Sequence, residues 1–200
     1  MRNRFLATVF LAFMLSLTAN AQTLRFDFGN GTTAEGYTAV TPDTEYSDEK
    51  GYGFVESRGS RGPKPVLVSF QRNSADALRS DFISSEAQFT FAVKLPQGNY
   101  RVKLILGDVA GTSRTSVRAE QRRLMLEAVS TTVGETVEKT FGVNVRDHLL
   151  SPGNAIKFDS REWDYSRQCA LMDTWDDKLT LNFCDEHPCV CALEIEPIND

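Results

Sequence analysis

Two alternating segments joined by a turn decide the fold: Phe-Thr-Phe-Ala-Val-Lys-Leu-Pro-Gln-Gly-Asn-Tyr-Arg-Val-Lys-Leu-Ile-Leu, residues 89–106. Apolar side chains occupy every second position from Phe89 to Leu95 and again from Tyr100 to Leu106. Because a strand points successive side chains to opposite faces, this period predicts two strands, each with one buried and one solvated face. The turn sequence at 96–99 predicts that the two strands form an antiparallel hairpin.

Similar patterns recur along the rest of the chain. Further strands are expected at 24–28, 66–70, 122–129, 137–145, 155–158, 178–183 and 190–196, and the best helix candidate is the short segment 74–79. Polar, turn-rich stretches at 41–50, 59–65 and 159–177 are expected to be loops. Many short strands separated by turns predict an all-β domain, a two-sheet antiparallel jelly-roll sandwich, with a barrel as the alternative.

The N-terminus has the features of an export signal. Arg2 and Arg4 precede an apolar run at 5–17, and Ala19-Asn20-Ala21 supplies the small residues that a signal peptidase needs. The apolar run is too short to span a bilayer. We therefore expect residues 1–21 to be removed and residues 22–200 to form one exported domain in the periplasm, at the cell surface or outside the cell.

The charge balance narrows the expected partners. Without residues 1–21 the chain has 20 basic and 27 acidic side chains, a net charge of −7. An acidic protein lacks the electrostatic attraction that nucleic acids and anionic membranes require, so we expect neither as a partner. A uronate-bearing sugar would need a local basic site.

The four cysteines all lie near the C-terminus. Cys189 and Cys191 are two residues apart on an expected strand, which places them poorly for a bond with each other. Cys169–Cys184 and Cys184–Cys189 are both acceptable pairings, and the spacing does not choose between them.

The sequence lacks the motifs of hydrolytic catalysis. No G-x-S-x-G block is present, and the two histidines, His148 and His187, stand at an expected strand end and an expected turn. No cofactor-binding motif is present either. The 27 acidic residues leave paired carboxylates for glycosidase chemistry open. The best candidate is the cluster of Asp173, Asp176 and Asp177 beside Trp175, and the alternative is a loop with a purely structural role.

A sugar-binding site needs an aromatic face and a few fixed polar groups. The richest candidate set falls in the loop 159–177 and consists of Trp163, Tyr165, Trp175, Arg161, Arg167, Asp176 and Asp177. The alternative is that the two tryptophans fill the core beneath a long loop. Arg122 and Arg123 are neighbours on a strand, so at most one of them, here Arg123, lines a given site.

A structural calcium ion is a further expectation. Asp27 on the first strand would meet Glu194 or Glu196 on the last strand if those two strands pair. Calcium requires six to eight oxygen ligands, and the sequence does not identify that many.

Several blocks resemble the N-terminal domain of bacterial rhamnogalacturonan acetylesterases, over essentially the whole chain after residue 21 and in the same order. They are Phe26-Asp27-Phe28-Gly29, Gly36 to Pro42, Gly51-Tyr52-Gly53-Phe54, Leu95 to Tyr100, Gly107-Asp108, Arg122 to Glu127, Asp176 to Leu181 and Cys191 to Glu196.

This resemblance implies a galactose-binding-like sandwich that precedes an SGNH hydrolase domain, which removes acetyl groups from pectin. No catalytic residue of that hydrolase has a counterpart in this sequence. We therefore expect a non-catalytic, carbohydrate-associated module, a fragment of a longer esterase, whose partner is acetylated pectin or an SGNH catalytic domain. The alternatives are a purely structural domain packed on a catalytic domain, and a stand-alone glycan-active enzyme that uses the acidic loop residues.

Overall fold

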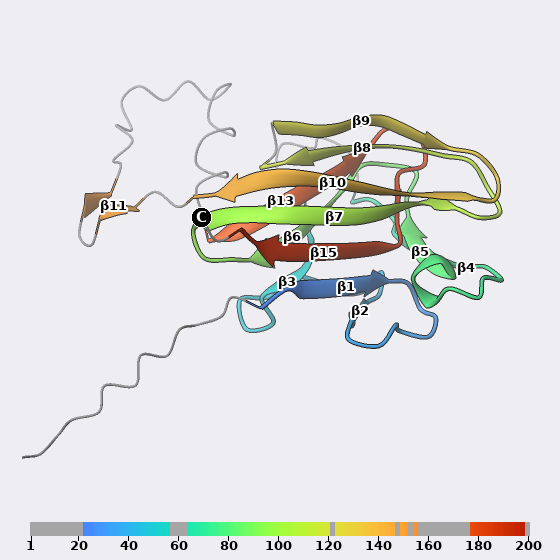
Figure 1. Ribbon diagram of the computed structural model, residues 1–200, viewed down its shortest axis with the longest axis horizontal. Coiled ribbons are helices and arrows are strands. Elements are labelled where there is room, and N and C mark those ends of the chain that lie inside the picture. Colours follow the sequence, from blue (N-terminus) through green and yellow to red (C-terminus); the bar gives the residue numbers. More distant parts are fainter. Residues whose placement is uncertain are drawn as a thin grey trace, which may run out of the picture.

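Two five-stranded sheets packed face to face make up most of the structure. The computed structural model describes residues 22–56, 64–120, 123–146, 149–151, 154–155 and 177–198. The first sheet has the order β10-β7-β15-β1-β2, with β10 (Glu135–Val145), β7 (Gly98–Asp108), β15 (Ala192–Pro197), β1 (Leu24–Phe28) and β2 (Thr38–Val40). Its strands run side by side across the molecule in Figure 1, and all pairs are antiparallel except β1 with β2.

The second sheet lies behind the first and has the order β3-β6-β13-β8-β9. Its strands are β3 (Tyr52–Val55), β6 (Phe89–Lys94), β13 (Lys178–Cys184), β8 (Ser113–Ala119) and β9 (Arg123–Thr131). All of its pairs are antiparallel. The predicted two-sheet β-sandwich is therefore confirmed, and the barrel alternative is wrong.

Smaller elements complete the described part of the chain. A three-stranded sheet has the order β14-β5-β4, with β14 (Cys189–Val190), β5 (Asp81–Ser84) and β4 (Val68–Gln71). A 3-10 helix, η1 (Ala77–Arg79), occupies the end of the expected helical segment. Strands β11 (Leu149–Ser151) and β12 (Asn154–Ala155) pair with each other. In the described part of the chain, no helix is long and apolar enough to cross a membrane.

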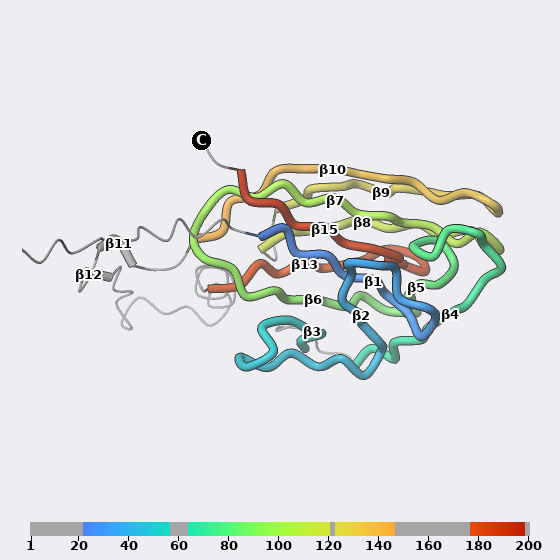
Figure 2. Tube along the Cα trace, turned by 60° about the horizontal axis from the view of Figure 1, so that its bottom comes forward, coloured from blue at the N-terminus to red at the C-terminus, as the bar shows by residue number. Residues whose placement is uncertain are grey.

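The expected hairpin between 89–95 and 100–106 is wrong. β6 pairs with β3 and β13 in the second sheet, whereas β7 pairs with β10 and β15 in the first. Figure 2 shows the green tube turning round one end of the sandwich from β6 to β7. The turn at 95–98 is therefore an arch between sheets, which lets the apolar faces of both strands meet in one core.

Aromatic rings fill the core between the sheets. Phe91 of β6 lies with its ring centroid 5.5 Å from Phe26, 5.0 Å from Phe28 and 5.3 Å from Phe54, each in an edge-on arrangement. Edge-to-face rings at this separation are favourable beyond the area they bury. These contacts join β1 of the first sheet to β3 and β6 of the second.

A second, smaller apolar cluster lies on the other face of the first sheet. Ile105 and Ala192 point away from the main core and pack with Phe82, Cys189 and Cys191, and Tyr37 and Leu78 border them. The small sheet and η1 thus cover part of that outer face.

Candidate functional site

An open groove of about 630 Å³ lies beside β3, on the side where the segment 42–46 is hydrogen-bonded to that strand. One wall is the segment 42–46, another is β3, and a third is the segment 64–67. Aromatic and charged residues share the lining of the groove, among them Asp43, Glu45, Tyr46, Phe54, Glu56 and Lys64. Its volume is in the range of sites that hold small organic ligands.

Gly53 allows the 42–46 segment to lie against β3. Its φ is +144°, and a Cβ there would come 2.4 Å from the backbone nitrogen of Tyr46, so only glycine fits. The two segments are joined by hydrogen bonds from Tyr46 N to Phe54 O (3.0 Å) and from Phe54 N to Thr44 O (2.8 Å). The shape of the groove therefore depends on this close backbone approach.

Tyr46 is the polar aromatic residue of the groove. Its hydroxyl donates to Asp48 Oδ1 at 3.0 Å, and Lys178 Nζ lies 5.7 Å from its ring centroid. Partial burial, and next the hydrogen bond to Asp48, raise the pKa of Tyr46 to about 12. The phenol therefore stays protonated at neutral pH and acts as a hydrogen-bond donor, not as a base.

The rims of the groove carry both signs of charge. Lys64 Nζ lies 2.7 Å from Glu45 Oε1, and both side chains are exposed. The hydrogen bond from Lys64 lowers the pKa of Glu45, so this carboxylate is ionised at neutral pH. Asp43 and Glu56 are further acidic groups there. Carboxylates and an ammonium group of this kind can accept from and donate to sugar hydroxyls.

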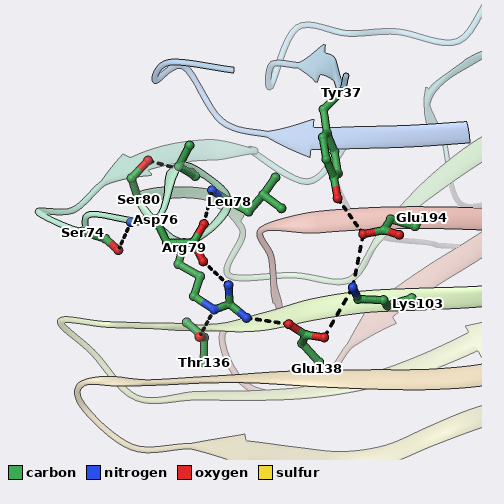
Figure 3. Close-up of polar contacts among 11 residues, drawn as sticks. Tyr37, Ser74, Asp76, Leu78, Arg79, Ser80, Lys103, Thr136, Glu138 and Glu194 are labelled. Atoms are coloured by element: carbon green, nitrogen blue, oxygen red, sulfur yellow. Dashed lines mark hydrogen bonds and ion pairs between the residues drawn. The ribbon is translucent and has the colours of Figure 1, made fainter. Parts of the chain in front are cut away.

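A row of polar side chains crosses the outer face of the first sheet (Figure 3). The Tyr37 hydroxyl donates to Glu194 Oε1 at 2.6 Å, and Lys103 bridges Glu194 (3.3 Å) and Glu138 (3.4 Å). Arg79 of η1 then reaches Glu138 at 2.6 Å. These contacts tie β15, β7, β10 and η1 together, so the row holds η1 against the first sheet.

The expectation of a structural calcium ion at Asp27, Glu194 and Glu196 stays a prediction. β1 and β15 do pair, with Arg25 opposite Glu194 and Asp27 opposite Ala192. Glu194, however, is bound by Tyr37 and Lys103. Glu196 is bound by Arg101 at 2.9 Å. Within the described ranges, no three His, Cys, Asp or Glu residues converge as metal ligands.

Asp27 is a buried carboxyl, only 3% exposed. Its Oδ2 accepts from Ala34 N at 2.8 Å, and its Oδ1 is buried with no hydrogen-bond partner. Burial, and to a smaller extent the charges of Asp81 and Asp76, raise the pKa of Asp27 to about 6, although the hydrogen bond from Ala34 acts in the opposite direction and lowers it. The group therefore gains its proton more readily in the folded than in the unfolded chain.

Replacing Asp27 by asparagine is expected to change how stability depends on pH. Between about pH 4 and pH 6 the folded wild type holds a proton that the unfolded chain has lost, so its stability falls as pH rises. The variant lacks this fall. The free energy of unfolding of the variant minus that of wild type should therefore be larger at pH 7 than at pH 4, by about 2 kcal/mol. Urea unfolding of both proteins at both pH values measures the difference, and a constant offset between them would contradict the expectation.

Of the predicted ligand-binding residues, only Asp177 and Arg123 lie in the part of the chain that the structure describes. Trp163, Tyr165, Trp175, Arg161, Arg167 and Asp176 lie outside the described residues, as do Asp173 and His148, so their roles stay predictions. Asp177 is exposed and pairs with Lys94 at 3.2 Å and Lys178 at 3.4 Å. Arg123 donates from Nη1 to Asn144 O at 2.9 Å, which ties β9 to β10.

His187 has the surroundings of a surface residue. It stands in the turn between β13 and β14, and its Nδ1 lies 3.4 Å from Glu86 Oε1, with both side chains well exposed. Across the described ranges, no serine or cysteine donates to a histidine. The described part of the chain therefore shows no nucleophile paired with a histidine.

The cysteines differ from the expected Cys184–Cys189 pair. Cys184, Cys189 and Cys191 are buried free thiols, and Cys169 lies outside the described residues. Cys184 Sγ donates to Ser116 O at 3.5 Å, whereas Cys189 Sγ accepts from Gly107 N at 3.1 Å. The two sulfurs face different partners because their strands belong to different sheets.

The groove was missed because it needs three segments that are separate in sequence. The stretch 41–50 was expected only as an exposed loop. The available signal is Gly51-Tyr52-Gly53-Phe54, where a glycine inside a strand pattern indicates a close backbone approach.

The sequence over residues 24–155 matches the family described as β-agarase/YxiM esterase-like, galactose-binding domain-like. The uncharacterized esterase YxiM of Bacillus subtilis is 34% identical over 133 residues, which cover 66% of this chain and 32% of YxiM. β-Agarase A of Zobellia galactanivorans is 29% identical over 164 residues, which cover 81% of this chain and 28% of the agarase. The chain thus spans about a third or less of the length of these relatives.

Solved structures show the same fold. The crystal structure of the Bacillus subtilis YxiM protein superposes with a TM-score of 0.60 and 25% identity, over 90% of this chain and 41% of that chain. A β-glucuronidase of Bacteroides uniformis superposes with a TM-score of 0.53 and 14% identity, over 90% of this chain and 18% of that chain, a likeness of fold alone.

Proposed function

The chain belongs to the galactose-binding-like domain family of β-agarase and YxiM-type esterases, and from this premise we propose that it is a non-catalytic module that binds polysaccharide in the groove along β3. The observation that carries the proposal is the groove itself. It gathers Tyr46 and Phe54 with the acidic residues Asp43, Glu45 and Glu56 and with Lys64 in one lining. Sugars present apolar C–H faces and a ring of hydroxyls, which such a surface complements.

The absence of catalysis is the second part of the proposal. His187 is exposed and lies 3.4 Å from Glu86, and no serine or cysteine donates a hydrogen bond to a histidine in the described ranges. Tyr46, the polar aromatic group in the groove, is held in its protonated form. On this proposal the groove supplies hydrogen-bonding groups for a ligand, and no histidine-paired nucleophile lies among its residues.

The polysaccharide we propose is acetylated pectin, and the activity that the module serves is deacetylation by an SGNH domain. Support comes from the match to YxiM, which is named an esterase and is about three times longer than the matched region. On this proposal residues 1–21 direct export, which brings the module to the wall polysaccharide outside the cytoplasm.

Binding to rhamnogalacturonan should depend on Tyr46. Calorimetric titration of the purified chain with rhamnogalacturonan fragments is expected to show binding, and Tyr46→Ala is expected to weaken it about tenfold, about 1.4 kcal/mol. Leu124→Ala removes an exposed apolar side chain on β9, away from the groove, and serves as the control with unchanged affinity.

Two results would reject the proposal. Absence of binding heat with wild type, for both rhamnogalacturonan and agarose fragments, would favour a purely structural domain. Hydrolysis of p-nitrophenyl acetate by the purified chain, well above a buffer blank, would show a catalytic site.

A further inference from the structure

A second hollow, of about 350 Å³, adjoins the groove. The residues Lys64, Pro65 and Val66 line both, so the two hollows meet at this short segment. The second hollow extends along β4 and is bordered by Val68, Phe70 and the exposed end of the β5–β6 loop.

The β4 side of this second hollow is apolar and exposed. Val66 is 75% exposed, Val68 42% and Phe70 37%, and these alternate residues form a stripe on one face of an edge strand. Large apolar side chains exposed in a row indicate a binding surface more often than isolated ones do.

Phe70 is held in place before any ligand arrives. Its ring stacks on Phe82 with centroids 5.3 Å apart, and the guanidinium of Arg72 lies 5.1 Å from its centroid. Arg72 is itself fixed by two hydrogen bonds to Asp108, at 2.8 and 2.9 Å. A rigid aromatic side chain loses little conformational entropy on binding, which favours a stacking role.

We propose that the two hollows are consecutive subsites for one extended glycan chain, with the first sugars at Tyr46 and later sugars against Val66 and Phe70. This inference rests on the proposed function and adds to it that the module recognises an internal stretch of polysaccharide, not a single sugar. Polysaccharide is favoured as the occupant because the stripe continues a groove with polar rims. Lys64 and His187 also border the second hollow and can meet sugar hydroxyls there.

The test is a titration series with rhamnogalacturonan and agaro-oligosaccharides, from disaccharide to octasaccharide, on three proteins. Wild-type affinity should rise with chain length until both hollows are filled. Phe70→Ala should weaken binding of the long chains about tenfold and leave the short ones unchanged. Tyr46→Ala should weaken both.

Val66→Ser provides a second variant of the stripe at a side chain too exposed to affect folding, and it should repeat the length-dependent loss. Affinity that does not rise with length, or long-chain binding unaffected by both stripe variants, would overturn the subsites while leaving the proposed function intact. If no oligosaccharide or polymer binds wild type, the proposed function fails and the subsites fail with it.

Discussion

Phe91→Ala is expected to lower the free energy of unfolding by about 3–5 kcal/mol, because the ring lies in the centre of the core between the sheets. Phe91 is fully buried and touches Phe26, Phe28 and Phe54. Removing the ring leaves a cavity that the neighbouring rings of Phe26, Phe28 and Phe54 cannot fill. Since domains are stable by only about 5–15 kcal/mol, this single change should bring the chain close to unfolding at 37 °C.

Urea unfolding followed by circular dichroism measures this loss. Val133→Ala is the control, because Val133 is 65% exposed in the turn before β10, and its truncation should change stability by no more than about 0.5 kcal/mol. A loss below about 1 kcal/mol for Phe91→Ala would mean that the aromatic cluster does not join the sheets as described.

Gly53→Ala is the second substitution for which we expect a large effect, and it should lower both stability and glycan binding. The new Cβ would lie 2.4 Å from Tyr46 N and 2.5 Å from Glu45 C, both backbone atoms that no rotamer change can move away. The 42–46 segment must therefore separate from β3 and lose its two hydrogen bonds. We expect a loss of about 3 kcal/mol or more in stability, together with loss of glycan binding.

Gly36→Ala separates the two causes of that effect. Gly36 also has a positive φ, +80°, but a Cβ there meets nothing within 4 Å. This variant should cost only the backbone strain, about 1–2 kcal/mol, with binding unchanged. Equal losses in the two variants would show that strain alone matters and that the contact with Tyr46 does not shape the groove.

Strands with regular alternation were predictable from the sequence. β1 and β7 have apolar side chains at alternate positions that face the core, β10 departs from this pattern at Lys139, and the expected segments lie on all three strands. Alternation does not say which strand is the partner, however. The arch from β6 to β7 was expected as a hairpin because a tight turn and a sheet-to-sheet arch use the same residues.

β8 was missed because three of its five buried residues, Ser113, Thr115 and Ser116, are polar. Thr115 is fully buried and its hydroxyl accepts from Cys189 N at 3.1 Å, while the hydroxyls of Ser113 and Thr131 lie 2.7 Å apart. Buried hydroxyls with partners are stable in a core, but in a sequence they resemble a loop. Contacts in the folded structure therefore identify this strand, whereas the pattern of its sequence does not.

The candidate site was predicted least well. The groove depends on Gly53 permitting contact between 42–46 and β3, and on segment 64–67, which no periodicity places beside them. The aromatic set of 159–177 was selected by composition, and it lies outside the described residues, so a role for it in sugar binding stays a prediction.

The most direct test of the central claim is a map of amide chemical-shift changes, recorded by NMR as rhamnogalacturonan oligosaccharides are added to the chain. We expect the changes to cluster at residues 42–46, 53–55 and 64–70, which border the two hollows. Changes confined to the polar row of the first sheet around Lys103 and Glu194, or to β9 and β10, would contradict it.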